Sequence, residues 1–383
     1  MKAIVNGTIL TPQAELIDKV LLFDERIVDI VDASFPITGV EIIDAQGKYV
    51  SPGLVDVHIH GYVGEDASDG SEEGVRKIAK ALLANGVTSF LPTTMTISSD
   101  EILIAFDIIR KLMHESTQKQ FDGSQILGCH AEGPFINPNK KGAQAEGNIL
   151  PPDAKAILPH KDIIKIITMA PEMVGGIQFI KDITNQSNIV VSIGHTNATY
   201  EQALEAIKAG ANHITHLFNA MTALNHRNPG VVGAALSTDV YTELITDTFH
   251  IHPGLFTFLH EVKNERLILI TDCTRAGGLP DGEYTLGGQP IFVKGIECRL
   301  ADGTIAGSVL RLNNAVKNYR DHANIPLWMA VKAASLNPAA SIGEVSRKGS
   351  LEIGKDADIA LFDKNLVCHK TFVRGELKYR LGV

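Results

Sequence analysis

Apolar and polar positions along the middle of the chain follow two alternating patterns. Short apolar runs rich in Val, Ile and Leu, typical of buried strands, are separated by longer stretches with apolar residues at helical spacing. A helix is predicted over 72–85, ended by Asn85-Gly86, and another begins at the capping box of Thr199 and Gln202. Strands that alternate with helices are typical of a parallel sheet with crossover helices. The predicted strands are residues 54–58, 89–92, 126–131, 164–169, 189–193, 213–215, 242–246 and 267–271.

These βα units predict an α/β fold, a (β/α)8 TIM-like barrel, over residues 51–347. The two ends of the chain differ from the middle, because they contain short β-rich runs broken by turns such as Asn6-Gly7. We therefore expect residues 1–50 and 348–383 to form one small β-sandwich domain built from both chain termini. Its strands are expected at residues 3–5, 19–23, 26–31, 41–44, 359–362, 367–369 and 371–373.

Composition narrows the class of protein. The 383 residues are 44% hydrophobic and 21% charged, as in ordinary soluble proteins, and the net charge is −9. This charge argues against nucleic acid or an anionic membrane as a partner, and an anionic substrate would need a local basic cluster. No apolar run is long enough to span a membrane or, at the N-terminus, to form a signal peptide. The four cysteines form no CxxC pair, so we expect a reducing, cytoplasmic location.

Two histidines close the first predicted strand on the same face. His58 and His60 are two positions apart, so their side chains project together, and such a pair can bind a transition metal. For an isolated His-x-His pattern, two hydrogen-bonded core histidines are an equally good explanation. The other strands favour the metal, because the carboxyl ends of barrel strands meet at one rim and several carry a ligand-type residue. The side chains concerned are His58, His60, Glu132, His195, His216 and Asp272.

Imidazole and carboxylate ligands suit Zn²⁺ or Fe²⁺ better than Mg²⁺ or Ca²⁺, which prefer oxygen ligands. His195 and His216 follow adjacent strands, and with Glu132 they leave one coordination position open, as a catalytic metal site requires. His58 and His60 could hold a second metal, with Glu132 bridging the two. We therefore expect one or two divalent metal ions, Zn or Fe, in each chain.

Three roles are open to Asp272. It could bind the metal, it could take a proton from water and return it to a leaving group, or it could cap the following turn. The acid/base role is favoured, because five other ligands are available. His130 is expected to face away from Glu132 and to support the core or the ligands. The pair Lys140-Lys141 is expected to be a solvated loop.

Longer motifs surround these strand ends. They are PGLVDVHIHG at 52–61, HAEGPF at 130–135, GHTNATY at 194–200, HLFNAM at 216–221, Thr271-Asp272, and the tail GSLEIGKDAD at 349–358. These segments, which span nearly the whole chain, resemble the amidohydrolase superfamily, and within it the N-acetylglucosamine-6-phosphate deacetylases. The motifs at 194–200 and 216–221 are specific to the deacetylases, whereas the His-x-His and the tail mark only the superfamily.

That resemblance implies hydrolysis of the N-acetyl group of N-acetylglucosamine 6-phosphate, giving glucosamine 6-phosphate and acetate in amino-sugar catabolism. It implies that Glu132, His195 and His216 hold the main metal and that Asp272 is the acid/base. It also implies contacts to a phosphorylated sugar, for which neutral donors and the planar fork of arginine are suited. The residues implied are Gln144, Asn219, Ala220 and His250, with Arg227 reaching in from the neighbouring subunit of a homodimer.

Two departures from the family's pattern bear on function. Gln144 stands where some members carry histidine, so polarisation of the acetyl carbonyl would depend more on the metal, with Gln144 as a hydrogen-bond donor. The carbamylated lysine on strand four of the superfamily is missing, since Lys165 lies at the wrong end of its strand. The missing lysine disfavours a cyclic amidase such as a dihydroorotase. The sequence is also compatible with an N-acetylgalactosamine-6-phosphate deacetylase and with a non-catalytic barrel that serves as a binding module.

Overall fold

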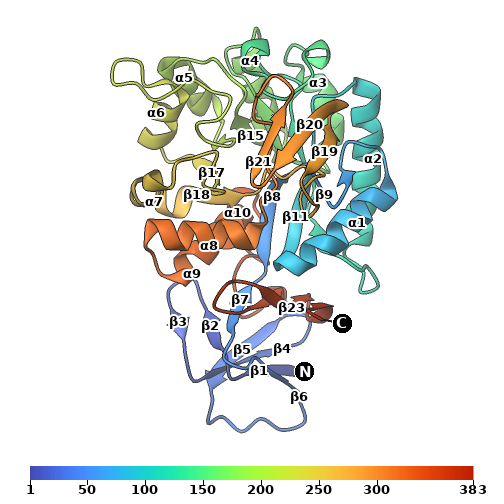
Figure 1. The fold of residues 1–383 in the computed structure, drawn as a ribbon, viewed down its shortest axis with the longest axis vertical. Coiled ribbons are helices and arrows are strands. Elements are labelled where there is room, and N and C mark those ends of the chain that lie inside the picture. Colours follow the sequence, from blue (N-terminus) through green and yellow to red (C-terminus); the bar gives the residue numbers. More distant parts are fainter. Residues whose placement is uncertain (383) are drawn as a thin grey trace.

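The structure, a computed structural model, describes residues 1–382 and confirms the predicted (β/α)8 barrel (Figure 1). Neighbouring strands pair in parallel in the order of the chain. The ring closes where the Asp272 amide donates to the His58 carbonyl at 2.9 Å. The barrel strands are β8 (Leu54–Ile59), β11 (Val87–Thr94), β13 (Cys129–Glu132), β14 (Ile164–Met169), β15 (Val190–Ile193), β16 (His213–Ile214), β17 (Tyr241–Ile245) and β18 (Leu267–Ile270).

The predicted third strand, 126–131, is divided in the structure. A short strand, β12 (Gln125–Ile126), pairs with β11, and β13 begins only at Cys129. Gly128 between them has φ 151°, and a Cβ there would lie 2.5 Å from the Ile163 carbonyl oxygen. The backbone therefore bends at this glycine, and the sequence pattern alone does not reveal the bend.

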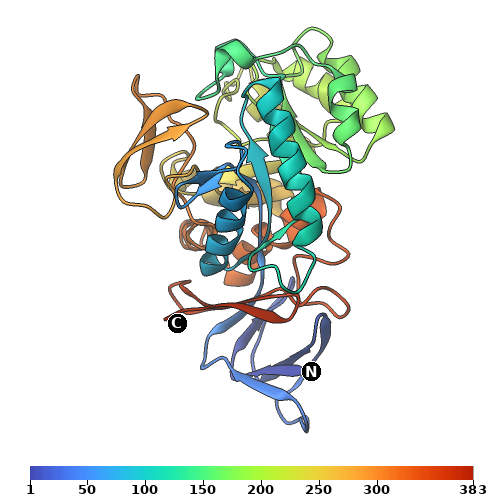
Figure 2. The same cartoon turned by 90° about the vertical axis from the view of Figure 1, so that its right-hand side faces the viewer.

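Helices cover the outside of the barrel (Figures 1 and 2). The first one ends as predicted, because a 3-10 turn carries the chain from its last residue to Asn85 and Gly86 then adopts φ 74°. The predicted capping box is also present, with both hydrogen bonds between Thr199 and Gln202. The helices are α1 (Glu72–Leu82), α2 (Ser99–Glu115), α3 (Ala154–Ile157), α4 (Gly176–Gln186), α5 (Tyr200–Ala209), α6 (Gly230–Ser237), α7 (Phe256–Lys263), α8 (Leu312–Ala323), α9 (Leu327–Ala333) and α10 (Leu336–Ser341).

Both chain termini contribute strands to a small β-domain below the barrel, which confirms the predicted β-sandwich (Figure 1). Strand β22 from the tail pairs antiparallel with β7 from the N-terminal segment. The tail strand predicted in two pieces is continuous. The domain limits themselves, 1–50 with 348–383 and 51–347, stay a prediction. One sheet contains β5 (Ile27–Asp32), β4 (Lys19–Phe23), β1 (Lys2–Val5) and β6 (Glu41–Asp44), and the other β24 (Glu376–Arg380), β23 (Cys368–Val373), β22 (Ile359–Phe362), β7 (Tyr49–Pro52), β2 (Thr8–Leu10) and β3 (Glu15–Leu16).

A three-stranded antiparallel sheet between β18 and α8 was not predicted from the sequence. It stands out from the side of the barrel, in orange in Figure 2. Its inner residues Ile291 and Val293 belong to one buried cluster with Met95 and Ala276. Its strands are β19 (Gly282–Leu286), β20 (Gln289–Lys294) and β21 (Glu297–Leu300).

Within residues 1–382, none of the helices combines the length and the apolar character needed to cross a membrane.

Candidate metal centre

Three of the predicted site residues lie where barrel strands end in an unusual backbone turn. His195, His216 and Asp272 have φ angles of 46°, 29° and 48°. This left-handed conformation costs a residue with a Cβ about 1–2 kcal/mol, and it persists where surrounding contacts enforce it, commonly at functional sites. Gly194 permits the turn at His195, because a Cβ at Gly194 would lie 2.7 Å from the Cβ of Thr215. The turns end the strands and bring the three side chains together.

Glu132 lies at the centre of the cluster that these side chains form. Its Oε1 is 3.1 Å from Nε2 of His216, 3.2 Å from Nε2 of His195 and 3.3 Å from Nε2 of His58. Its Oε2 is 3.2 Å from Nε2 of His60. Glu132 therefore contacts both His195 and His216 and the pair His58 and His60, so its carboxylate could be shared between two metal ions.

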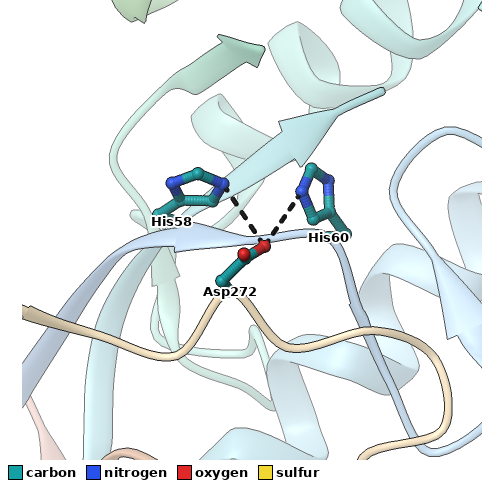
Figure 3. A group of neighbouring side chains, drawn as sticks. All are labelled: His58, His60 and Asp272. Carbon is teal, nitrogen blue, oxygen red and sulfur yellow. Dashed lines mark ion pairs between the residues drawn. The ribbon is translucent and has the colours of Figure 1, made fainter. Parts of the chain in front are cut away.

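Asp272 faces the histidine pair of the first strand (Figure 3). Its Oδ1 is 3.3 Å from Nε2 of His60 and 3.5 Å from Nε2 of His58. These three residues form one group whose ligand atoms are close enough to share a metal ion. Glu132, His195 and His216 form a second such group, and His58, His130 and Glu243 form a third. The predicted ligands and the predicted acid/base thus all meet at one end of the barrel.

Burial and neighbouring charges shift the pKa values of this cluster in opposite directions. Burial lowers the pKa of His60, but hydrogen bonds with Asp272 and Glu132 outweigh it and raise the pKa to about 10. Burial raises the pKa of Asp272, but His58 and His60 outweigh it and lower the pKa to about 2. Carboxylates that stay ionised and attract protons onto neighbouring imidazoles favour a bound cation as well.

The donor atoms fit a divalent transition metal. Nε2 of His58 is buried and makes no hydrogen bond, although the carboxylates of Glu132 and Asp272 lie within 3.5 Å of it. A buried nitrogen without a hydrogen bond is costly unless it has another partner, and a metal ion would be that partner.

A second layer of polar side chains lies inside the barrel next to the ligands. His130 is 3.0 Å from the Val57 carbonyl through Nδ1 and 2.7 Å from the Thr168 hydroxyl through Nε2. Its ring centroid is 4.5 Å from that of His58. The expectation that His130 faces away from Glu132 is wrong, because residues two apart in a strand share a face. Its position against His58 agrees with the other part of the expectation, that His130 supports the core or the ligands.

Two buried carboxylates next to the ligands were missed by the sequence analysis. Burial raises the pKa of Glu243, but the adjacent His58 outweighs it and lowers the pKa to about 2. Asp56 accepts a hydrogen bond from the Thr271 hydroxyl at 2.6 Å, and burial raises its pKa to about 7. Each is a lone charged residue inside an otherwise uncharged or apolar strand segment, and that pattern could have identified both.

A cavity of about 390 Å³ opens next to the cluster, which is a volume typical of small-molecule sites. The structure places most of the predicted substrate-binding residues on its wall, beside the predicted ligands. Those lining it are His60, Glu132, His195, His216, Asp272, Gln144, Asn219, Ala220 and His250.

Gln144 and His250 are both held in place by neighbouring polar groups. The Gln144 amide donates to Glu132 Oε2 at 2.5 Å, and its oxygen accepts from the Thr96 backbone N–H at 2.7 Å. Gln144 therefore orients Glu132 and keeps one N–H for another acceptor. Nδ1 of His250 is 2.6 Å from Asp247 Oδ2, which leaves the other ring nitrogen for a ligand.

Arg227 and Lys140 differ in their position relative to the cavity. Arg227 is exposed and does not line the cavity. The expectation that Lys140 belongs to a solvated loop is wrong, because Lys140 is half-buried and is the one Lys or Arg on the cavity wall within residues 1–382. Its Nζ donates to the Met221 carbonyl at 3.1 Å, adjacent to Ala220. The contact joins segments distant in sequence, so no local signal predicts it.

The superfamily's strand-four lysine has no counterpart at this rim. Lys165 is at the amino end of β14, where its ammonium is 2.8 Å from Glu344 Oε1. The interior of that strand near the ligands carries Thr168, whose hydroxyl contacts His130. Glu132 is therefore the bridging candidate that the structure provides.

Comparison with known proteins agrees with this geometry. Residues 49–378 match the amidohydrolase family. An N-acetylglucosamine-6-phosphate deacetylase from Lysinibacillus sphaericus is 39% identical, over 89% of this chain and 88% of that protein. An N-acetylgalactosamine-6-phosphate deacetylase from Escherichia coli is 35% identical, over 92% of this chain and 93% of that protein. The crystal structure of N-acetylglucosamine-6-phosphate deacetylase from Pasteurella multocida has a TM-score of 0.92 at 32% identity, over 98% of this chain and 99% of that one. The resemblance inferred from the motifs is confirmed, and this chain belongs to the amidohydrolase family.

Proposed function

We propose that this protein is a metal-dependent N-acetylglucosamine-6-phosphate deacetylase of amino-sugar catabolism. It hydrolyses the acetamide of N-acetylglucosamine 6-phosphate to glucosamine 6-phosphate and acetate. The observation that carries the proposal is the convergence of six ligand-type side chains at one end of the barrel. Five of them line a cavity whose wall also holds the polar residues suited to a sugar phosphate. Membership of the amidohydrolase family and similarity to enzymes of that name support it.

The proposed cofactor is Zn²⁺ or Fe²⁺, with one or two ions in each chain. Glu132, His195 and His216 would hold the first ion, and His58 and His60 the second, with Glu132 shared between them. When bound, such a metal acts as a Lewis acid that polarises the acetyl carbonyl and favours ionisation of water. The contacts of the Glu132 carboxylate with the histidines of both proposed sites support the shared ligand.

Asp272 is the proposed general base and acid. Its lowered pKa keeps the carboxylate ionised at neutral pH, ready to take a proton from the attacking water. The same proton then passes to the amine nitrogen as the carbon–nitrogen bond breaks. The free N–H of Gln144 is the proposed donor to the acetyl carbonyl oxygen, where negative charge develops.

The phosphate is proposed to lie beside Asn219 and Ala220, with His250 near the sugar. Lys140 places a positive charge at this part of the cavity, which an acidic chain needs in order to bind a phosphorylated substrate. In a homodimer, Arg227 of a second subunit would add a further cation. Its exposed position, outside the cavity of its own chain, is compatible with that role.

The dimer proposal has its own test by subunit mixing. Arg227→Ala and Asp272→Asn subunits should each be nearly inactive alone. If Arg227 acts across the interface, a mixed dimer has one cavity with both residues intact, so mixing after dissociation should restore activity. No recovery in mixtures that form heterodimers would contradict the shared site.

Acetate release from a panel of substrates tests the function. N-acetylglucosamine 6-phosphate should be turned over faster than its galactosamine epimer, and unphosphorylated N-acetylglucosamine and dihydroorotate should be poor substrates. Preference for the epimer would reassign the enzyme as an N-acetylgalactosamine-6-phosphate deacetylase. Binding without turnover by metal-loaded protein would instead support a binding module.

We also propose a cytoplasmic location, with which the four buried, free cysteines agree.

A further inference from the structure

Glu243 is a buried carboxylate that lies next to the metal-competent residues without reaching the cavity. It is in the middle of β17, its side chain is fully buried, and it is absent from the cavity lining. A buried carboxylate has a large desolvation cost, so a fold retains it only where it has strong partners. The partners of Glu243 therefore indicate what it does.

A single oxygen of Glu243 contacts a predicted ligand of each proposed metal site. Its Oε2 is 2.9 Å from Nδ1 of His58 and accepts from the backbone N–H of His216 at 3.1 Å. The backbone carbonyl of Glu243 also accepts from the N–H of Leu217 at 2.9 Å. Strand β17 thereby fixes a ligand from β8 and the backbone of a ligand that follows β16.

Each contact sets the geometry of a ligand. With Nδ1 of His58 donating to Glu243, the lone pair of that imidazole is on Nε2, the atom that points toward Glu132 and Asp272. The hydrogen bond to His216 N–H stabilises the backbone turn at φ 29°, which directs that side chain to the cluster. Loss of the carboxylate would release both ligands.

We propose that Glu243 is the positioning residue that holds His58 and His216 in ligand geometry and links the two proposed metal sites. The inference rests on the metal-dependent function proposed above. Glu243 touches neither the cavity nor substrate, so its effect is on metal binding first and on turnover only through the metal.

The test is metal affinity, measured without substrate. In Glu243→Ala, titration of metal-free protein with Zn²⁺ against a competing chelator should show affinity lowered by about 10- to 100-fold, the usual effect of removing a residue that orients a ligand. Metal per chain at limiting Zn²⁺ should fall with it. Glu243→Gln should lose less, because its amide oxygen still accepts both hydrogen bonds. This rescue by the conservative variant separates positioning from simple loss of stability.

Thr242→Val is the matched control. Thr242 is equally buried and precedes Glu243 in β17, but its hydroxyl donates to the Val240 carbonyl at 3.3 Å and contacts no predicted ligand. Its Zn²⁺ affinity should stay close to wild type. If Glu243→Ala fails to fold, Glu243→Met, which fills a similar volume but cannot replace the carboxylate as an acceptor, takes its place in the comparison with Thr242→Val.

Wild-type Zn²⁺ affinity in a folded Glu243→Ala or, failing that, in Glu243→Met would overturn the inference while leaving the deacetylase proposal intact. Conversely, wild-type protein that binds Zn²⁺ but releases no acetate would overturn the deacetylase proposal. The weakened Zn²⁺ binding of the Glu243 variants would still support the positioning role.

Discussion

Replacement of Asp272 by asparagine removes one charge from the site and leaves the local fold unchanged. The backbone contacts of Asp272 are independent of the side chain: its N–H donates to the His58 carbonyl at 2.9 Å, and its carbonyl accepts from the Ser308 N–H at 2.8 Å. Asparagine also tolerates the φ of 48° at this position, since Asn and Asp both visit the left-handed region. Asp272→Asn should therefore fold normally.

The expected effect on turnover is large. The Asp272 carboxylate is ionised at neutral pH, since its pKa is about 2, and its Oδ1 is within 3.5 Å of Nε2 in both His58 and His60. An asparagine amide cannot take a proton from water. General acid–base catalysis contributes about 10²- to 10⁴-fold, so kcat should fall by that factor, equivalent to a barrier increase of about 3–5 kcal/mol.

The assay measures acetate release and metal content on the same preparation. Turnover should collapse while the metal held by Glu132, His195 and His216 is retained, because Asp272 does not belong to that group. A kcat within tenfold of wild type would refute the acid/base role. Loss of that metal together with turnover would instead make Asp272 a ligand that the first metal needs.

Three further predictions concern the proposed phosphate contact, the metal-free site and the packing of the barrel. Lys140→Met should raise KM for the phosphorylated sugar by about tenfold or more, as expected for a lost charge-assisted hydrogen bond, with little change for the unphosphorylated sugar; equal effects on both would contradict a phosphate contact. In chelated protein, the pKa of His60 is raised to about 10, so protonated His60 stabilises the fold fully below pH 6.5, and this stabilisation is lost as pH rises toward 10. The melting temperature should therefore fall over that interval and rise again with added metal. Phe90→Ala, at a fully buried barrel position, should cost about 3–5 kcal/mol in denaturant unfolding; a loss under 1 kcal/mol would contradict tight packing there.

The barrel and its ligands were predictable because both depend on local pattern. Buried parallel strands have short apolar runs in the sequence, and a polar residue within such a run marks an inward position, as at His58. A fold that brings all strand ends to one rim then places Glu132, His195 and His216 together without further information.

The features that were missed depend on contacts between distant segments. The charge of Glu243 within an apolar run is visible in the sequence, but its partner His58 is 185 positions away, and Lys140 is 81 positions from Met221. The sequence around each residue therefore does not identify its partner. The sheet of β19–β21 exposes most of β19 and buries only alternate residues of β20, which gives a weak pattern within a barrel sequence. The prediction for His130 was wrong because residues 130 and 132, two positions apart in a strand, point to the same face and not to opposite faces.

The most direct test of the central claim is acetate release from N-acetylglucosamine 6-phosphate. It is measured before a chelator removes the metal, after the removal, and after metal is added back. The geometry around Glu132 predicts turnover that disappears with the metal and returns with Zn²⁺ or Fe²⁺. Turnover that persists in protein shown to be metal-free would contradict a metal-dependent deacetylase, and so would its absence in folded protein shown to be metal-loaded.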